Sequence, residues 1–151
     1  MAGEYATPGT SFMNAVDTNV LIYGLDDNEP AKQAKAQALL ARLVQPPVDT
    51  VLPWQVTGEL LSRLRKWETA GRLTTADVEA HFRDTLALFP LIIPPVKVFE
   101  IAFDLHARFS LSHWDSMILA ACKEVGVSTV YSEDLAPGTD YDGLAVVNPF
   151  V

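Results

Sequence analysis

Short, wholly apolar segments alternate along this chain with longer segments of helical character, and this alternation restricts the possible fold more than any other feature. Strands without regular polar positions are typical of sheets that are buried on both faces. Strands that take turns with helices predict an α/β fold, with a mostly parallel sheet and helices on both faces. The expected strands are 14–16, 50–52, 91–93, 128–131 and 144–147, and the expected helices are 31–43, 53–70, 74–89, 98–108 and 112–125.

Two segments are less clearly defined by their residues. The run 20–23 is apolar and could extend the first strand or begin a helix, and 138–143 is expected to be a loop. The chain shows no internal repeat, so we expect one domain over 13–151. Residues 1–12 are rich in Gly, Thr, Pro and Ser, which indicates a flexible extension or a cloning remnant.

The formal net charge of −8 argues against a protein that coats nucleic acid, because such proteins are normally basic. It argues less against an enzyme, since bound divalent cations reverse the local potential. The single cysteine, Cys122, excludes an internal disulfide and lies in an apolar run, so a packed thiol is expected. The sequence shows neither a signal peptide nor a membrane-spanning segment, and a cytoplasmic protein with no membrane partner is expected.

Four acids stand where an apolar strand ends or a helix begins. Asp17 and Asp134 follow expected strands, while Glu59 and Asp115 lie in the first turns of expected helices. In open α/β sheets, ligands bind beyond the carboxyl ends of the strands. Carboxylates that gather in one place repel one another unless a cation offsets their charge, and oxygen ligands favour Mg²⁺ or Mn²⁺. This placement favours metal-assisted cleavage of a phosphodiester.

Each acid also has a purely structural explanation. Asp17 could cap a helix that follows the first strand. Ser112 and Asp115 have the spacing of a capping box, and Thr74 and Asp77 repeat that spacing where we expect no chemistry. The functional hypothesis therefore depends on the acids occurring together.

A loose group of basic residues lies on the helix that carries Glu59. Its members are Arg63, Arg65, Lys66 and Arg72. They could contact a phosphate backbone, or they could form an ordinary solvated helix face.

Four motifs resemble those of the PIN-domain nucleases, and within that family the VapC-type toxins of type II toxin–antitoxin systems. They are Val16-Asp17-Thr18-Asn19-Val20-Leu21-Ile22-Tyr23, Glu59-Leu60-Leu61, Trp114-Asp115-Ser116-Met117-Ile118-Leu119-Ala120-Ala121 and Tyr131-Ser132-Glu133-Asp134-Leu135. The likeness extends from about Met13 to the end of the chain.

The resemblance implies a three-layer α/β/α sandwich with a mostly parallel central sheet. It also implies a Mg²⁺- or Mn²⁺-dependent endoribonuclease that cuts RNA, forms a homodimer and is blocked by a cognate antitoxin. By position, the acidic quartet that catalyses and binds metal would be Asp17, Glu59, Asp115 and Asp134, assisted by the polar side chains of Asn19 and Ser132.

Other functions remain open at this stage. A PIN-like domain could have lost activity and serve only to bind a partner. A phosphatase of the haloacid-dehalogenase type would use Asp17 as its nucleophile, but it needs a second Asp where this chain has Asn19. A receiver-like domain needs an Asp after a middle strand, and none of the expected strands between 50 and 93 ends in one.

Overall fold

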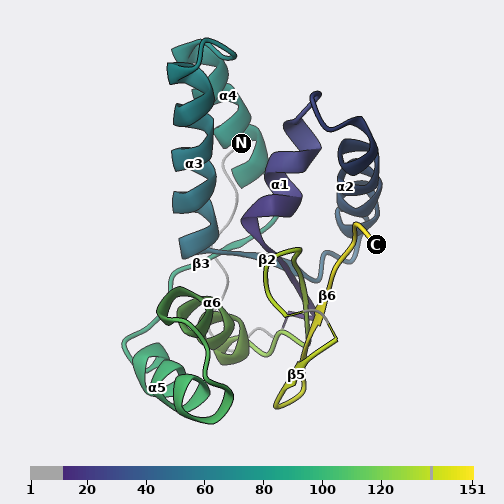
Figure 1. Cartoon of the computed structure of the whole chain (residues 1–151). Coiled ribbons are helices and arrows are strands. Elements are labelled where there is room, and N and C mark those ends of the chain that lie inside the picture. The colour runs from purple at the N-terminus through teal and green to yellow at the C-terminus, as the bar shows by residue number, and fades with distance from the viewer. Residues whose placement is uncertain (1–11, 137) are drawn as a thin grey trace.

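A parallel sheet with one antiparallel edge strand forms the centre of the molecule in the computed structural model, which describes residues 12–136 and 138–151. Within that part, the sheet has the strand order β3-β2-β1-β4-β6-β5, and only the β5–β6 pair is antiparallel (Figure 1). The strands are β1 (Asn14–Val16), β2 (Thr50–Pro53), β3 (Leu91–Ile92), β4 (Thr129–Tyr131), β5 (Asp140–Tyr141) and β6 (Leu144–Val147).

Helices cover both faces of this sheet. They are α1 (Thr18–Leu25), α2 (Pro30–Leu43), α3 (Trp54–Thr69), α4 (Thr75–Leu86), α5 (Val98–Phe109) and α6 (His113–Glu124). The first four lie on one side, where α3 and α4 form a tall hairpin, and α5 and α6 pack together on the other side (Figure 1). The predicted α/β class and the three-layer arrangement are therefore confirmed.

The segment 20–23, which the sequence left open, is helical. Asp17 caps the N-terminus of α1 with an extended backbone, and its carboxylate accepts the N–H of Thr18. Val20, Leu21 and Ile22 are all buried, because α1 lies between the sheet and its neighbours α2 and α3. A helix surrounded on several sides is apolar all round, and its sequence therefore resembles that of a buried strand.

The expected loop over 138–143 is partly wrong, because it contains β5. Asp142 and Gly143 both adopt positive φ, at 57° and 89°, and this turn folds β5 back onto β6. Asp and Gly are residue types that tolerate this conformation. The strand is only two residues long, and its first residue is a charged Asp, so it carries no apolar pattern.

Phe12 is the first residue that the structure describes. Its side chain is buried in the core, and its backbone N–H donates to the carbonyl oxygen of Val125. Phe12 therefore packs with the domain, although the expected extension included it. The rest of the proposed extension, residues 1–11, lies outside the described residues. Among those that are described, no helix combines the length and apolar character needed to cross a membrane.

The apolar stripe of α3 fixes which of its residues face outward. Val56, Leu60 and Leu64 recur every four residues and are fully buried against the sheet and α1. Residues three and four apart share a helix face, so the residue just before each of Leu60 and Leu64 lies at the edge of this stripe. Glu59 and Arg63 occupy such positions and are exposed.

Candidate functional site

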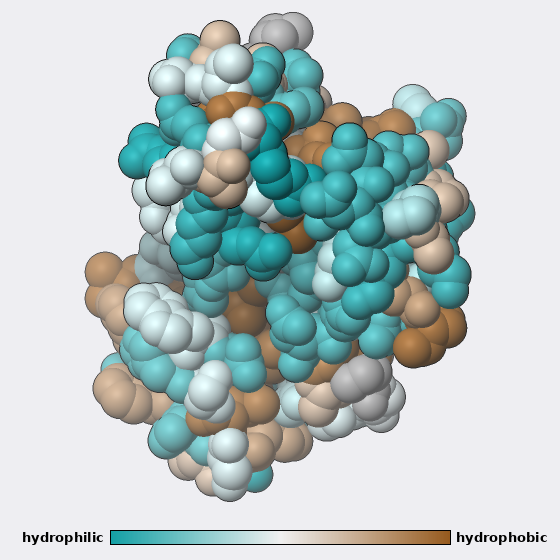
Figure 2. Space-filling model, turned by 45° about the horizontal axis from the view of Figure 1, so that its top comes forward, coloured by the Kyte–Doolittle hydropathy of each residue, from teal (hydrophilic) through white to brown (hydrophobic). Residues whose placement is uncertain are grey.

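All four acids singled out in the sequence line one cleft of about 360 Å³. Asp17 joins β1 to α1, Asp134 lies in the loop after β4, Glu59 comes from α3 and Asp115 from the first turn of α6. Because β1 and β4 are parallel neighbours, their carboxyl ends open on the same edge of the sheet. Figure 2 shows hydrophilic side chains gathered around a hollow on this side of the molecule.

Asp17 is the most enclosed of the four, with 8% of its surface exposed. Its Oδ1 accepts the N–H of Thr18 at 2.7 Å, and its Oδ2 accepts the hydroxyl of Ser132 at 2.7 Å. Burial raises the pKa of Asp17 above its ordinary value, the two hydrogen bonds lower it, and the nearby charges of Glu59 and Asp134 raise it further. Acids also outnumber basic residues in the lining of the cleft, where the four carboxylates face only Arg63 and Lys66 among the described residues.

Ser132 and Asn19 tie the loop that carries Asp134 to the start of α1. The Oγ of Ser132 also accepts the N–H groups of Asp134 and Leu135, each at 3.2 Å. The amide of Asn19 donates to Oδ2 of Asp134 at 3.1 Å, and its oxygen accepts the N–H of Glu133 at 3.2 Å. These are the contacts expected of residues that orient an acid by hydrogen bonding.

Glu59 is exposed, yet two neighbours hold its carboxylate. Thr18 donates its hydroxyl to Oε2 at 2.8 Å, and Gln55 donates its amide to Oε1 at 3.0 Å. The same amide lies 3.2 Å from the carbonyl oxygen of Trp114, so it joins the first turns of α3 and α6. Neither Thr18 nor Gln55 was among the predicted site residues, although Thr18 stands between Asp17 and Asn19, which were.

Asp115 and Asp77 have the same sequence spacing from a capping residue but use their carboxylates differently. In α4 the capping box is complete, since Thr74 accepts from the N–H of Asp77 and the Asp77 carboxylate accepts from the N–H of Thr74. In α6 only the first half is present within the described residues, where Ser112 accepts from the N–H of Asp115. The carboxylate of Asp115 faces the cleft instead.

The donor set of the cleft suits a hard divalent cation. All four acids offer oxygen ligands, and none of them forms an ion pair with Lys or Arg in the part of the chain that the structure describes. Among the same residues, no three acids, histidines or cysteines stand close enough together to enclose an ion directly. The arrangement therefore fits an ion that keeps part of its water shell, as Mg²⁺ commonly does.

Basic and aromatic residues complete the lining of the cleft. Arg63 and Lys66 reach it from α3, and Trp114 reaches it from α6. The basic group expected on α3 is thereby divided. Arg72 pairs with Asp26 and packs its guanidinium 4.2 Å from the centre of a Trp ring, while Arg65 lines a different hollow.

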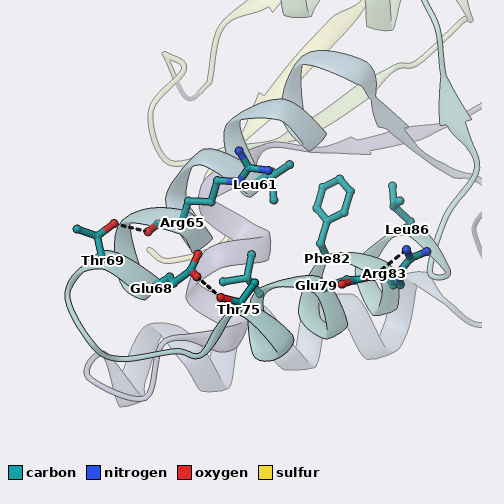
Figure 3. Close-up of a pocket in the computed structure, with 10 residues that line it drawn as sticks. Leu61, Arg65, Glu68, Thr69, Thr75, Glu79, Phe82, Arg83 and Leu86 are labelled. Atoms are coloured by element: carbon teal, nitrogen blue, oxygen red, sulfur yellow. Dashed lines mark hydrogen bonds and ion pairs between the residues drawn. The ribbon is translucent and has the colours of Figure 1, made fainter.

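That second hollow, of about 690 Å³, lies between α3 and α4 and contains none of the four acids. Figure 3 shows the Phe82 ring rising from α4 beside Leu61 of α3, with the charged side chains of Arg65, Glu79 and Arg83 around them. It is a groove with an apolar floor and a charged rim.

A sequence model of the PIN domain matches residues 15–136 of this chain. The chain belongs to the PIN domain family. The matched range contains the four acids together with Asn19 and Ser132. No curated protein shows a significant match to the sequence.

Solved structures share the PIN fold with this chain at low sequence identity. VapC20 of Mycobacterium tuberculosis, described as a toxin that cleaves the sarcin–ricin loop, aligns with a TM-score of 0.62 at 20% identity, over 80% of this chain and 89% of that one. A toxin–antitoxin complex from Klebsiella pneumoniae aligns with a TM-score of 0.62 at 23% identity, over 90% of this chain and 97% of that one. VapBC2 of Rickettsia felis, bound to a promoter DNA fragment, aligns with a TM-score of 0.65 at 11% identity, over 89% of this chain and 97% of that one.

Proposed function

We propose that this chain is a Mg²⁺- or Mn²⁺-dependent endoribonuclease and the toxin of a toxin–antitoxin pair. The observation that carries the proposal is the set of four carboxylates that line one cleft in a member of the PIN family, none of them paired with Lys or Arg among the residues that the structure describes. The structural likeness to toxins, one of them described as cleaving the sarcin–ricin loop, supports RNA as the substrate.

In this proposal the acids hold the ion and the neighbouring polar groups keep the acids in place. Asp17, Asp115 and Asp134 bind one or two divalent cations, in part through the water shell, and Glu59 completes the site directly or through water. A divalent cation bound there lowers the pKa of a water molecule and offsets charge on the phosphate during displacement. Ser132 orients Asp17, and Asn19 orients Asp134, through the hydrogen bonds described above.

The partner in this proposal is an antitoxin that blocks the cleft. One of the similar structures is described as a toxin–antitoxin complex, and another as VapBC2 bound to promoter DNA, which supports this part of the proposal. The groove between α3 and α4 provides an apolar floor of Leu61 and Phe82 for an amphipathic segment of that partner. Arg65 on its rim suits an acidic side chain on such a segment.

We also propose that the chain forms a homodimer. Val96 lies in the turn before α5, and Phe99 and Phe103 follow it on that helix at spacings of three and four residues. Their exposed fractions are 82%, 53% and 71%. Large apolar side chains that are exposed together on one stripe commonly mark an association surface. A second copy of the chain would bury this stripe.

The test is cleavage of single-stranded RNA with and without Mg²⁺. The wild type should cleave in Mg²⁺ and stop when EDTA removes the metal, and Asp115→Asn should lose cleavage. Asp77→Asn is the matched control, because it changes the equivalent acid of another helix outside the cleft. Wild-type rates from Asp115→Asn would reject the assignment. Metal binding without cleavage of any RNA would favour a silent binding module instead.

A further inference from the structure

Trp114 exposes 63% of its surface although it lines the same cleft as the acids. Its position is fixed at the backbone, because the amide of Gln55 donates to its carbonyl oxygen. On one side, the ring of His113 packs edge-on against it, with centroids 4.5 Å apart and an angle of 71°. A large aromatic ring is thus held at the site with much of its surface open to water.

The basic residues of this acidic chain are distributed in a way that points to the same cleft. Six of the 11 Lys and Arg residues form ion pairs among the described residues, which leaves five without one. Three of these five lie on one turn of α3, namely Arg63, Arg65 and Lys66. Arg63 and Lys66 line the acidic cleft.

Glu59 does not neutralise Arg63, although it lies one helical turn before it. Both oxygens of the Glu59 carboxylate are engaged by other groups, namely the hydroxyl of Thr18 and the amide of Gln55. Among the described residues Arg63 forms no ion pair, so its N–H groups can donate to an anionic ligand. Phosphate groups of a nucleic acid backbone are ligands of this kind.

We propose that the cleft binds a single-stranded segment of RNA, with one unstacked base on the ring of Trp114 and its backbone phosphates beside Arg63 and Lys66. This inference rests on the proposed function, and it adds the form of the substrate and the residues that position it. The four acids lie in the same cleft as these three residues, so the strand would pass over the metal site.

The aromatic ring of Trp114 selects single-stranded RNA over duplex RNA. In a duplex the faces of the bases are stacked on their neighbours and cannot reach a protein ring. An aromatic side chain stacks on any base, so Trp114 contributes affinity and position with little sequence preference. The cations contact the backbone, which likewise carries no sequence information.

The first experiment measures binding without cleavage. A fluorescently labelled single-stranded RNA of random sequence is titrated with Asp17→Asn protein in Mg²⁺, because that background should not cut it. Adding Trp114→Ala should weaken binding roughly 5- to 150-fold, which is the effect of losing one base stack, and Trp114→Phe should restore most of it. Trp54→Ala is the control, since Trp54 is similarly exposed, at 56%, but does not line the cleft.

The second experiment measures the salt dependence of the same binding. Arg63→Ala and Lys66→Ala should each reduce the slope of log K against log salt by about 0.7, the value for one phosphate contact with a single strand. Arg65→Ala is the matched control, because Arg65 is also unpaired but lies in the hollow between α3 and α4. Its slope should stay close to that of the parent protein.

Three results would overturn the inference. The first is equal binding by Trp114→Ala and Trp54→Ala proteins, and the second is an equal effect of Trp114→Ala on a blunt RNA duplex. The third is a Trp114→Ala protein that binds the RNA as tightly as its parent but loses affinity for a protein partner, which would assign the ring to a protein surface. Binding that follows the expected pattern in a chain that never cleaves RNA would instead refute the proposed function and leave this inference standing.

Discussion

The hydroxyl of Ser132 donates to Oδ2 of Asp17 at 2.7 Å across 115 positions of sequence. The strand register brings them together, because Val16 of β1 pairs with Tyr131 of β4, and each of the two residues follows one member of that pair. The hydroxyl of Ser132 thus holds Asp17, the most buried acid of the cleft. It also accepts the N–H of Asp134 and so holds the loop that carries this second acid.

Ser132→Ala should therefore weaken metal binding and cleavage by about 10- to 100-fold, which is typical when a residue that orients a metal ligand is removed. The measurement is the Mg²⁺ concentration that gives half-maximal cleavage, together with the maximal rate. Ser116→Ala is a suitable control, because Ser116 is also buried but its hydroxyl donates to the carbonyl of Ser112. Equal metal dependence in both variants would contradict the role of Ser132.

Asp17→Asn should stabilise the metal-free fold while it abolishes cleavage. Folding raises the pKa of Asp17 above its ordinary value of 3.8, so ionising this group in the folded state disfavours folding. The penalty is absent below pH 3.8 and is complete once the pH exceeds the raised pKa. Thermal unfolding in EDTA should give Asp17→Asn the higher Tm at neutral pH, with the gap closing in acid. A lower Tm at neutral pH would oppose this account.

The contribution of Asp142 to stability should depend on pH in the opposite sense to that of Asp17. Hydrogen bonds from Arg108 and Lys123 hold the pKa of Asp142 well below its usual range, so its ionised form favours the fold. That contribution is present above the ordinary value of 3.8 and disappears as the pH falls toward the lowered pKa. Asp142→Asn should lower the Tm at neutral pH and have little effect in strong acid. Asn is the appropriate replacement because it tolerates the positive φ of this position.

Phe12→Ala should destabilise the fold by about 3–5 kcal/mol, the usual effect of removing a buried Phe side chain. Met13→Ala should change the free energy of unfolding by no more than about 0.5 kcal/mol, because Met13 is exposed. Denaturant unfolding of the two variants compares them directly. Similar midpoints would show that the packed chain begins after Phe12.

Phe103→Glu should shift the protein from dimer to monomer if α5 forms the proposed interface. A charge placed in the middle of an apolar contact must lose its hydration, and this opposes association. Light scattering over a range of concentrations gives the mass. Val48→Glu, which changes an exposed apolar residue in a loop, should keep the wild-type mass.

Much of the fold could be predicted because its strands are apolar throughout and its helices begin with recognisable caps. Thr74 and Ser112 are N-caps as expected, and the parallel sheet follows from the alternation of elements. The segment 20–23 could not be assigned from its residues, since a helix packed on several sides loses its polar stripe. The β5 strand was missed because its pairing depends on the turn at Asp142 and Gly143, where local backbone conformation decides the structure.

For the site, the sequence could indicate that Asp17, Asp115 and Asp134 lie near element ends, but it could not give their contacts. Glu59 was expected in the first turn of its helix and instead lies one turn further along α3. Nothing in the residues distinguishes Asp115 from Asp77, because the difference lies in what each carboxylate accepts. That Arg72 forms an ion pair away from the cleft while Arg63 lines it also follows from the tertiary structure, since it depends on the position of Asp26 at the end of α1. The roles of the four acids in metal binding stay predictions until the variants are measured.

The place of β4 in the sheet has a consequence for how the protein is made. Its residues, Thr129–Tyr131, occur late in the chain, yet β4 lies beside the first strand at the centre of the sheet. A ribosome must therefore deliver everything from Asp17 to Asp134 before these two acids can meet. A nascent chain that has reached only Asp115 contains three of the acids but cannot assemble the complete cleft.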